Sequence, residues 1–204
     1  MEAKKFTQDW FSRSIPAWDH LLRQLKENSQ SLKVLEVGVF EGRSTCWLLE
    51  NHCREKDALI TVIDTFAGGV EHGGLDLINL RDIFERNVSL SDSLASVEVF
   101  CGYSSQELCR LVALGRGAPG YDFISIDASH QAADVLADCV IAFQLLRSGG
   151  LMALDDYLWS LEDTASRSPL NSPKIAIDAF TNIFSNKIRI VPDLPLYQLY
   201  VQKV

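Results

Sequence analysis

Acidic side chains follow two short apolar segments of the chain, and their chemistry suits a metal ion. Asp127 ends the segment YDFISID, and Asp155 and Asp156 follow the apolar residues that begin at Leu151. Three carboxylates in one place would raise each other's pKa, and a divalent cation would remove that conflict. Oxygen ligands favour a hard ion, and Mg²⁺ commonly keeps waters beside a few carboxylates. We therefore expect Mg²⁺ at Asp127, Asp155 and Asp156; the alternative is that the adjacent pair only caps a loop while Asp127 works without metal.

His130 lies three residues after Asp127, near the expected start of a helix. A bound Mg²⁺ would lower the pKa of a coordinated hydroxyl, and an imidazole that titrates near pH ~6.5 can accept the proton. Asp127 and His130 are thus the candidate catalytic residues. His130 can equally be a residue that hydrogen-bonds locally or orients Asp127.

These side chains need a sheet to bring them together, and the chain alternates apolar strands with helical segments. This alternation favours a parallel sheet covered on both faces. It predicts a Rossmann-like, doubly wound α/β fold with seven strands, mostly parallel, and an antiparallel C-terminal strand. The helix that ends at Ser148-Gly149-Gly150 has the length of a right-handed crossover, which would put Asp127 beside the Asp155–Asp156 pair. The expected strands are 33–39, 59–64, 97–101, 121–127, 151–155, 188–191 and 197–202, and the expected helices are 45–50, 77–87, 105–114, 132–146 and 174–185.

A glycine turn follows the first expected strand, in the segment EVGVFEGRST from Glu36 to Thr45. Glycine lets the backbone approach a ligand, and the free N–H groups of the following helix face it. The spacing is GxxxG, and Phe40 stands where a dinucleotide-binding turn has its second glycine. The turn therefore suits a ligand without a pyrophosphate, which argues against an NAD-dependent enzyme.

Asp64 ends the second expected strand, LITVID. A carboxylate at that place can accept hydrogen bonds from both hydroxyls of a ribose. The alternative is an ordinary acid that caps the end of a strand.

The glycine turn from Glu36 to Gly42, together with Asp64, Asp127 and Ser148-Gly149-Gly150, resembles the class I methyltransferases that use S-adenosylmethionine (SAM). Within that class the chain looks like the small-molecule O-methyltransferases of the catechol and macrolide-sugar type, over about residues 32–204. The resemblance implies SAM as cofactor and a small-molecule acceptor. It also supports the metal site, since the metal-dependent members have acidic or amide ligands at corresponding places. Many relatives pair, so a homodimer stays open.

The resemblance further implies a role for each part of the cofactor site. Gly38 and Gly42 would border the methionine part of SAM, Glu36 would shape the loop, and Ser44 would lie near the carboxylate. Tyr103 and Ser104, after the third strand, would lie against the adenine. The full expected cofactor set is Glu36, Gly38, Val39, Phe40, Gly42, Ser44, Thr45, Asp64, Thr65, Tyr103, Ser104 and Asp127.

Composition narrows the remaining function classes. The 204 residues suffice for one full α/β core, which we expect over 31–204, with residues 1–30 as a helical lid or decoration. The net charge of −8 and the lack of a Lys/Arg cluster argue against nucleic acid and anionic membranes. No segment has the length of a membrane span or the character of a signal peptide, and the scattered cysteines suit reduced thiols, so we expect a cytoplasmic enzyme.

Three functions remain as alternatives. The first is a Mg²⁺-dependent O-methyltransferase, and the second is a metal-independent N- or O-methyltransferase with Asp127 or His130 as base. The third is a non-catalytic module that binds SAM or a partner. Trp159 and the loop 160–173 would reach the acceptor or pack on the N-terminal helices, and His72 would lie in a glycine-rich surface loop or in one that covers the cofactor.

Overall fold

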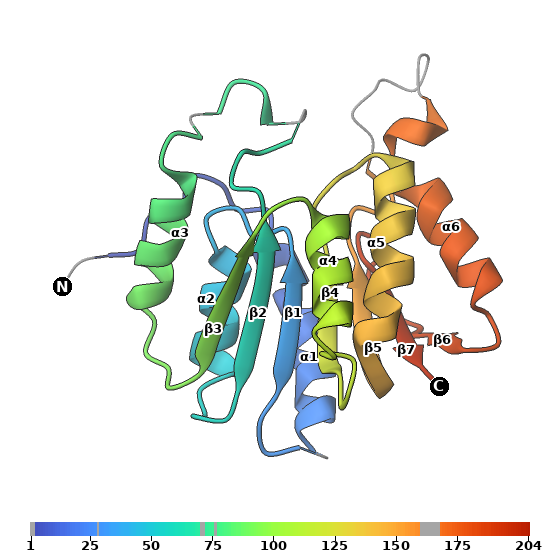
Figure 1. Cartoon of the computed structure of the whole chain (residues 1–204), viewed down its shortest axis with the longest axis horizontal. Helices are drawn as coiled ribbons and strands as arrows, with labels where there is room; N and C mark the ends of the chain where they lie inside the picture. Colours follow the sequence, from blue (N-terminus) through green and yellow to red (C-terminus); the bar gives the residue numbers. More distant parts are fainter. Residues whose placement is uncertain (1–2, 28, 70–71, 76, 160–167) are drawn as a thin grey trace.

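A single seven-stranded sheet forms the centre of the molecule (Figure 1). The computed structural model describes residues 3–27, 29–69, 72–75, 77–159 and 168–204. The strand order is β3-β2-β1-β4-β5-β7-β6. The strands are β1 (Lys33–Val37), β2 (Leu59–Asp64), β3 (Ser96–Cys101), β4 (Tyr121–Ile126), β5 (Leu146–Leu154), β6 (Ile188–Ile190) and β7 (Leu199–Lys203).

The pairing of the strands confirms the predicted doubly wound fold. The pairs among β1 to β5 are parallel. β7 runs antiparallel to both of its neighbours, β5 and β6. The chain moves outward from β1 to β3 and then crosses back to β4 on the other side of β1. Such a reversal opens a crevice at the carboxyl ends of β1 and β4, where sheets of this kind bind ligands.

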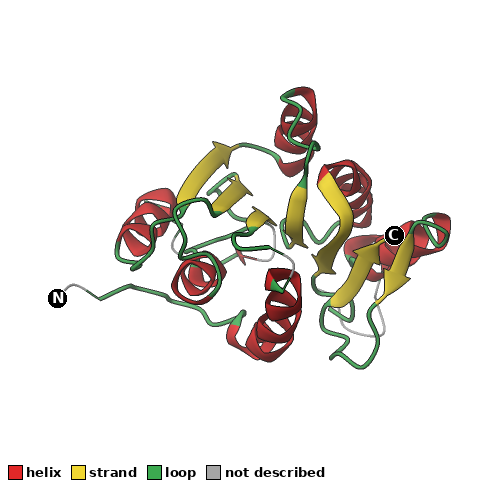
Figure 2. Ribbon diagram, turned by 90° about the horizontal axis from the view of Figure 1, so that it is seen from below, coloured by secondary structure: helices red, strands yellow, loops and turns green. Residues whose placement is uncertain are grey.

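Helices cover both faces of the sheet, as Figure 2 shows. Buried residues of α1, α2 and α3 form one apolar cluster with the sheet, and those of α4, α5 and α6 form a second cluster on the opposite face. The helices are α1 (Ile15–Lys26), α2 (Arg43–Asn51), α3 (Leu80–Ser89), α4 (Ser104–Ala113), α5 (Ala132–Leu145) and α6 (Lys174–Ile183), with short 3-10 turns η1 (Ser12–Ser14) and η3 (Pro169–Asn171).

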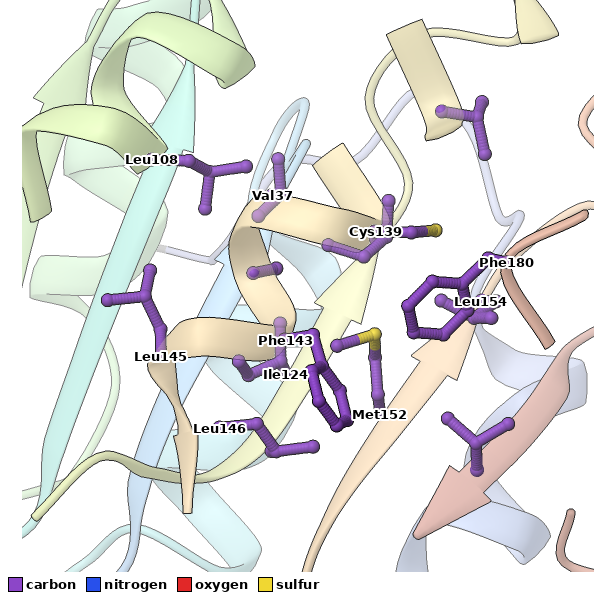
Figure 3. Close-up of a cluster of buried hydrophobic side chains, with 14 of the residues drawn as sticks. Val37, Leu108, Ile124, Cys139, Phe143, Leu145, Leu146, Met152, Leu154 and Phe180 are labelled. Atoms are coloured by element: carbon purple, nitrogen blue, oxygen red, sulfur yellow. The ribbon is translucent and has the colours of Figure 1, made fainter. Parts of the chain in front are cut away.

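The second cluster fixes α5 against the middle of the sheet (Figure 3). Cys139 and Phe143 of α5 pack over Ile124 of β4 and Met152 of β5. All four are less than a tenth exposed, and burying a side chain of this size stabilises a fold by about 1.5–3 kcal/mol. This packing sets the positions of the ends of β4 and β5, which carry the acidic residues.

One predicted boundary is wrong in an informative way. We expected the fifth helix to run to residue 146 and the strand to begin at 151, but α5 ends at Leu145 and β5 begins directly at Leu146. The strand contains an irregularity, because Tyr121 pairs with Leu146 whereas Phe123 pairs with Leu151. Gly149 has φ +74° and lets the backbone make this bulge. The glycines therefore lie within a strand and do not end the helix.

The described residues include no helix that is long and apolar enough to cross a bilayer.

Candidate functional site

Three strand ends meet at the crevice, and backbone hydrogen bonds hold them in register. The N–H of Asp127 donates to the carbonyl of Val37 at 2.7 Å, and the N–H of Asp155 donates to that of Ile126 at 3.0 Å. The residues after β1, β4 and β5 consequently lie side by side. The expected juxtaposition of the glycine turn, Asp127 and the Asp155–Asp156 pair is present.

The glycine turn takes backbone conformations that few side chains allow. Gly38 has φ +87° and Gly42 has φ +78°. Gly42 caps the N-terminus of α2, and a Cβ there would come within 2.7 Å of the Phe84 ring. Phe40, which replaces a glycine of the dinucleotide pattern, also has a positive φ of 49°. A strained residue at a ligand turn costs free energy, and such strain is common at functional sites.

Asp64 holds this turn in place. Its Oδ2 accepts hydrogen bonds from the backbone N–H groups of Val39 (2.7 Å) and Phe40 (3.0 Å), and its Oδ1 accepts one from Phe66 (2.7 Å). The ribose role predicted for Asp64 is not tested by these contacts. They give it a second role, which is to fix the turn before any ligand arrives.

Glu36 and Thr45 lie behind the turn and do not line its cavity. Both side chains are fully buried, and the Thr45 hydroxyl donates to Oε2 of Glu36 at 2.7 Å. Burial raises the pKa of Glu36 to about 7, against hydrogen bonds from Ser44 and Thr45 that lower it. Glu36 is therefore a buried support behind the glycine turn, and its predicted role in shaping the loop stays a prediction.

Asp127, Asp155, Asp156 and His130 form an acidic cluster, in which the group of potential ligand atoms comprises Asp127, His130 and Asp156 but not Asp155. Ligand atoms of Asp127, His130 and Asp156 all lie within 4.8 Å of one another. Nε2 of His130 is 2.6 Å from Oδ2 of Asp156, and the Asp156 N–H donates to Oδ1 of Asp155 at 2.8 Å. Asp156 itself has φ +54°, a left-handed turn that follows β5 directly.

The carboxyl groups of the cluster are hard to ionise together. Desolvation by the surrounding protein, followed by the charges of Asp155 and Asp156, raises the pKa of Asp127 well above its ordinary value. Desolvation and then the charge of Asp156 raise the pKa of Asp155 as well. Mutual repulsion of this kind is what a bound cation relieves.

One large cavity of about 1020 Å³ joins the glycine turn to the acidic cluster. Nine of the predicted cofactor residues line it, whereas Glu36, Gly42 and Thr45 do not; the nine are Gly38, Val39, Phe40, Ser44, Asp64, Thr65, Tyr103, Ser104 and Asp127. His130, Asp155 and Asp156 line the same cavity. The space can therefore hold a cofactor and an acceptor next to one another.

The N-terminal segment contributes residues that the sequence did not single out. The N–H and hydroxyl of Thr7 donate to the buried Glu41 carboxylate at 2.6 and 2.9 Å, which ties this segment to the glycine turn. Nη2 of Arg13 lies 3.5 Å from Oδ1 of Asp156, and its guanidinium stacks 4.1 Å from the centre of the Tyr197 ring. No local pattern marks Thr7 or Arg13, because their partners lie far along the chain.

Aromatic side chains cover two parts of the cavity. The rings of Phe40 and His72 stack with an interplanar angle of 7°, and Trp10 lies 5.0 Å from Phe40 and 5.5 Å from His72. Trp159 lies 4.3 Å from His130 between ring centres. His72 and Trp159 both line the cavity. The loop expected to reach the acceptor or the N-terminal helices includes residues 160–167, which lie outside the described part of the chain.

Comparison with known proteins identifies the class of this site. Residues 35–157 match the model of a family described as a methyltransferase domain. A sequence search of curated proteins finds no match.

Solved structures share the fold. The O-methyltransferase TomG from Streptomyces achromogenes, in complex with SAM, is 16% identical, with a TM-score of 0.63 over 93% of this chain and 79% of that chain. An O-methyltransferase from Bacillus cereus, in complex with S-adenosylhomocysteine (SAH), is 19% identical, with a TM-score of 0.61 over 100% and 84% of the two chains. MycE of the mycinamycin pathway, with Mg and SAH, is 18% identical, with a TM-score of 0.60 over 96% and 51%.

Proposed function

Because the chain belongs to the methyltransferase domain family that its residues 35–157 match, we propose that it transfers the methyl group of SAM to a hydroxyl of a small molecule, assisted by Mg²⁺. The observation that carries this proposal is the single cavity that joins the glycine turn to Asp127, His130 and Asp156. Structural neighbours that bind SAM, SAH and Mg support it.

The donor set fits a hard cation. Asp127, Asp155 and Asp156 would supply carboxylate oxygens, and Mg²⁺ binds oxygen at about 2.0–2.1 Å, so donors on opposite sides of one ion are about 4.2 Å apart. Of these three, Asp127 and Asp156 have ligand atoms within 4.8 Å of one another and of His130, which is close to that separation. Bound there, Mg²⁺ would act as a Lewis acid toward the acceptor hydroxyl.

The chain's own groups would position the acceptor hydroxyl against the methyl group of SAM. The acceptor oxygen attacks the methyl carbon, the carbon–sulfur bond breaks, and its electron pair stays on sulfur to give SAH. Alignment of the two reacting atoms can lower the activation free energy by about 7–11 kcal/mol. Nε2 of His130 lies 2.6 Å from Oδ2 of Asp156, so in the neutral ring its N–H would donate to that carboxylate. His130 would then accept the hydroxyl proton at Nδ1, and Asp156 would stabilise the imidazolium.

A metal-independent transfer is the second candidate, and the His130–Asp156 contact favours it. A histidine oriented by a carboxylate is a competent general base without any ion. In that case His130→Gln would abolish transfer, whereas EDTA would leave the rate unchanged.

Calorimetry tests the proposal. SAH is titrated into the protein in EDTA and in millimolar Mg²⁺, and Mg²⁺ is then titrated into the SAH complex. We expect cofactor binding in both buffers and a separate Mg²⁺ heat that Asp155→Asn abolishes. Asp92→Asn is the matched control, because that side chain is 98% exposed and pairs with Arg54 on the surface.

Each other outcome has a definite meaning. Cofactor binding without a metal effect would replace the first candidate by the second. No cofactor binding in either buffer would reject both and leave a non-catalytic module. If the first candidate holds, phenols and sugar hydroxyls are the acceptors to screen, since the neighbours include a TDP-rhamnose 3'-O-methyltransferase and MycE with mycinamycin VI.

A further inference from the structure

Gln198 is a buried residue of the cavity wall that lies opposite Asp155 in the sheet. It directly precedes β7, is only 5% exposed and lines the cavity. The antiparallel register pairs Leu154 of β5 with Leu199 of β7. Continued by one residue, this register sets Asp155 opposite Gln198, and side chains at opposite positions share one face of a sheet.

Two buried side chains hold the amide oxygen of Gln198. Nε1 of Trp18, from α1, donates to Oε1 at 2.8 Å, and the hydroxyl of Tyr200 donates to the same oxygen. Trp18 and Tyr200 are each 2% exposed. The ring of Trp18 is itself fixed by packing against Phe123 at 4.8 Å.

The indole group determines which way the amide points. An indole N–H can only donate, so the atom of Gln198 that it contacts must be the oxygen. The hydrogen-bond network therefore fixes the orientation of this amide. The nitrogen is left on the other side, facing Asp155.

Gln198 and Asp155 are also within reach of one another. Both residues line the cavity at the positions that the register sets opposite, and their side chains are hydrogen-bonded.

We propose that Gln198 is a positioning residue that donates its amide N–H to one oxygen of Asp155 and leaves the other oxygen to the cation. Trp18 acts on the site through Gln198, which makes α1 part of the support of the acidic cluster. The metal part of this inference rests on the proposed function. Partners of metal ligands commonly affect affinity by about 10–100-fold.

The first arm of the test needs neither cofactor nor metal. The side-chain amide resonances of Gln198 are identified by NMR as those that Gln198→Met removes. Both Trp18→Phe and Asp155→Asn are expected to shift them. Trp47→Phe is the matched control. Trp47 belongs to the same aromatic group, 5.5 Å from Phe11 and 6.4 Å from Trp18 between ring centres, but it is Trp18 that donates to Gln198. The proposal is overturned if Asp155→Asn leaves the chemical shifts of the Gln198 amide unchanged.

The second arm measures Mg²⁺ affinity in the SAH complex. We expect a loss of about tenfold for Gln198→Met and a smaller loss for Trp18→Phe. The double variant should bind Mg²⁺ no more weakly than Gln198→Met alone, because Trp18 acts only through Gln198. SAH affinity in EDTA should stay within twofold of wild type, which a general loss of structure would not permit.

The outcomes separate this inference from the proposed function. Wild-type Mg²⁺ affinity in Gln198→Met overturns the positioning role. If the wild-type protein shows no Mg²⁺ heat, the metal proposal fails, and the NMR arm still decides whether Gln198 holds Asp155. Trp18→Phe keeps an aromatic ring in the core and serves as the test variant should Gln198→Met fail to fold.

Discussion

Gly38 and Asp127 approach so closely that a Cβ on Gly38 would lie 1.9 Å from the carbonyl oxygen of Asp127. The first glycine of the glycine turn and the central acid of the proposed metal site are therefore in direct backbone contact. A change at one must displace the other.

We expect Gly38→Ala to destabilise the protein by about 3 kcal/mol or more, because the positive φ and the clash act together. SAH affinity should fall at least about 100-fold, as the turn and Asp127 separate. Gly115→Ala is the control: φ is +73° there but a Cβ would have nothing within 4 Å, so only the conformational cost of about 1–2 kcal/mol remains. Equal losses in urea unfolding of the two variants would contradict the importance of the contact.

Glu36 predicts a pH dependence of stability. Its pKa is about 7 in the folded protein and 4.5 ordinarily, so between these values the folded state binds more protons than the unfolded state. Stability therefore falls as pH rises through this window, by about 3 kcal/mol in total, and levels off above it. Glu36→Gln keeps an oxygen for the Thr45 hydroxyl and removes this loss.

Unfolding free energies at pH 5 and pH 8 measure the effect. Relative to wild type, the Glu36→Gln variant should gain about 2.5 kcal/mol on going to the higher pH, because pH 5 already lies within the window. A difference between the two proteins that is constant with pH would show that Glu36 is ionised in the folded state throughout.

Asp64→Asn should weaken cofactor binding by loosening the turn. An amide has one acceptor oxygen, so its nitrogen would face either the N–H groups of Val39 and Phe40 or that of Phe66, all of which now donate to Asp64. We expect a loss of at least about tenfold in SAH affinity, since at least one charge-assisted hydrogen bond is broken.

The ribose role of Asp64 needs a separate comparison. The 2′-deoxy analogue of SAH should bind the wild-type protein more weakly than SAH does. In Asp64→Ala the two ligands should bind equally. A penalty for the deoxy ligand that persists in this variant would assign the ribose hydroxyls to another group.

Arg13 is expected to compete with a cation for Asp156. Its guanidinium is about half exposed and lies 3.5 Å from that carboxylate, so Arg13→Gln should strengthen Mg²⁺ binding about threefold, most clearly at low salt. Arg23→Gln, which removes a charge paired with Asp19, is the control. Weaker Mg²⁺ binding in Arg13→Gln would mean that Arg13 supports the site and does not compete for it.

The sequence predicted those parts of the site that depend on neighbouring strands. Asp127 and Asp155 could be placed together because the ends of adjacent parallel strands meet at one edge. The prediction that Ser148-Gly149-Gly150 ends a helix was wrong. Glycines suit both a helix end and a β-bulge, and only the pairing of β5 with β4 decides between them. Residues that work through distant partners, such as Thr7 and Gln198, carry no local signal.

The hydrogen bond between Trp18 and Gln198 joins residues 180 positions apart in the chain. On the ribosome, α1 emerges early, yet its indole has no amide to bind until the last strand has been made. β7 then has to enter between β5 and β6. A premature stop before β7 would therefore remove more than the partner of Trp18, because Val201 and Tyr200 belong to the two apolar clusters that hold the helices on the sheet.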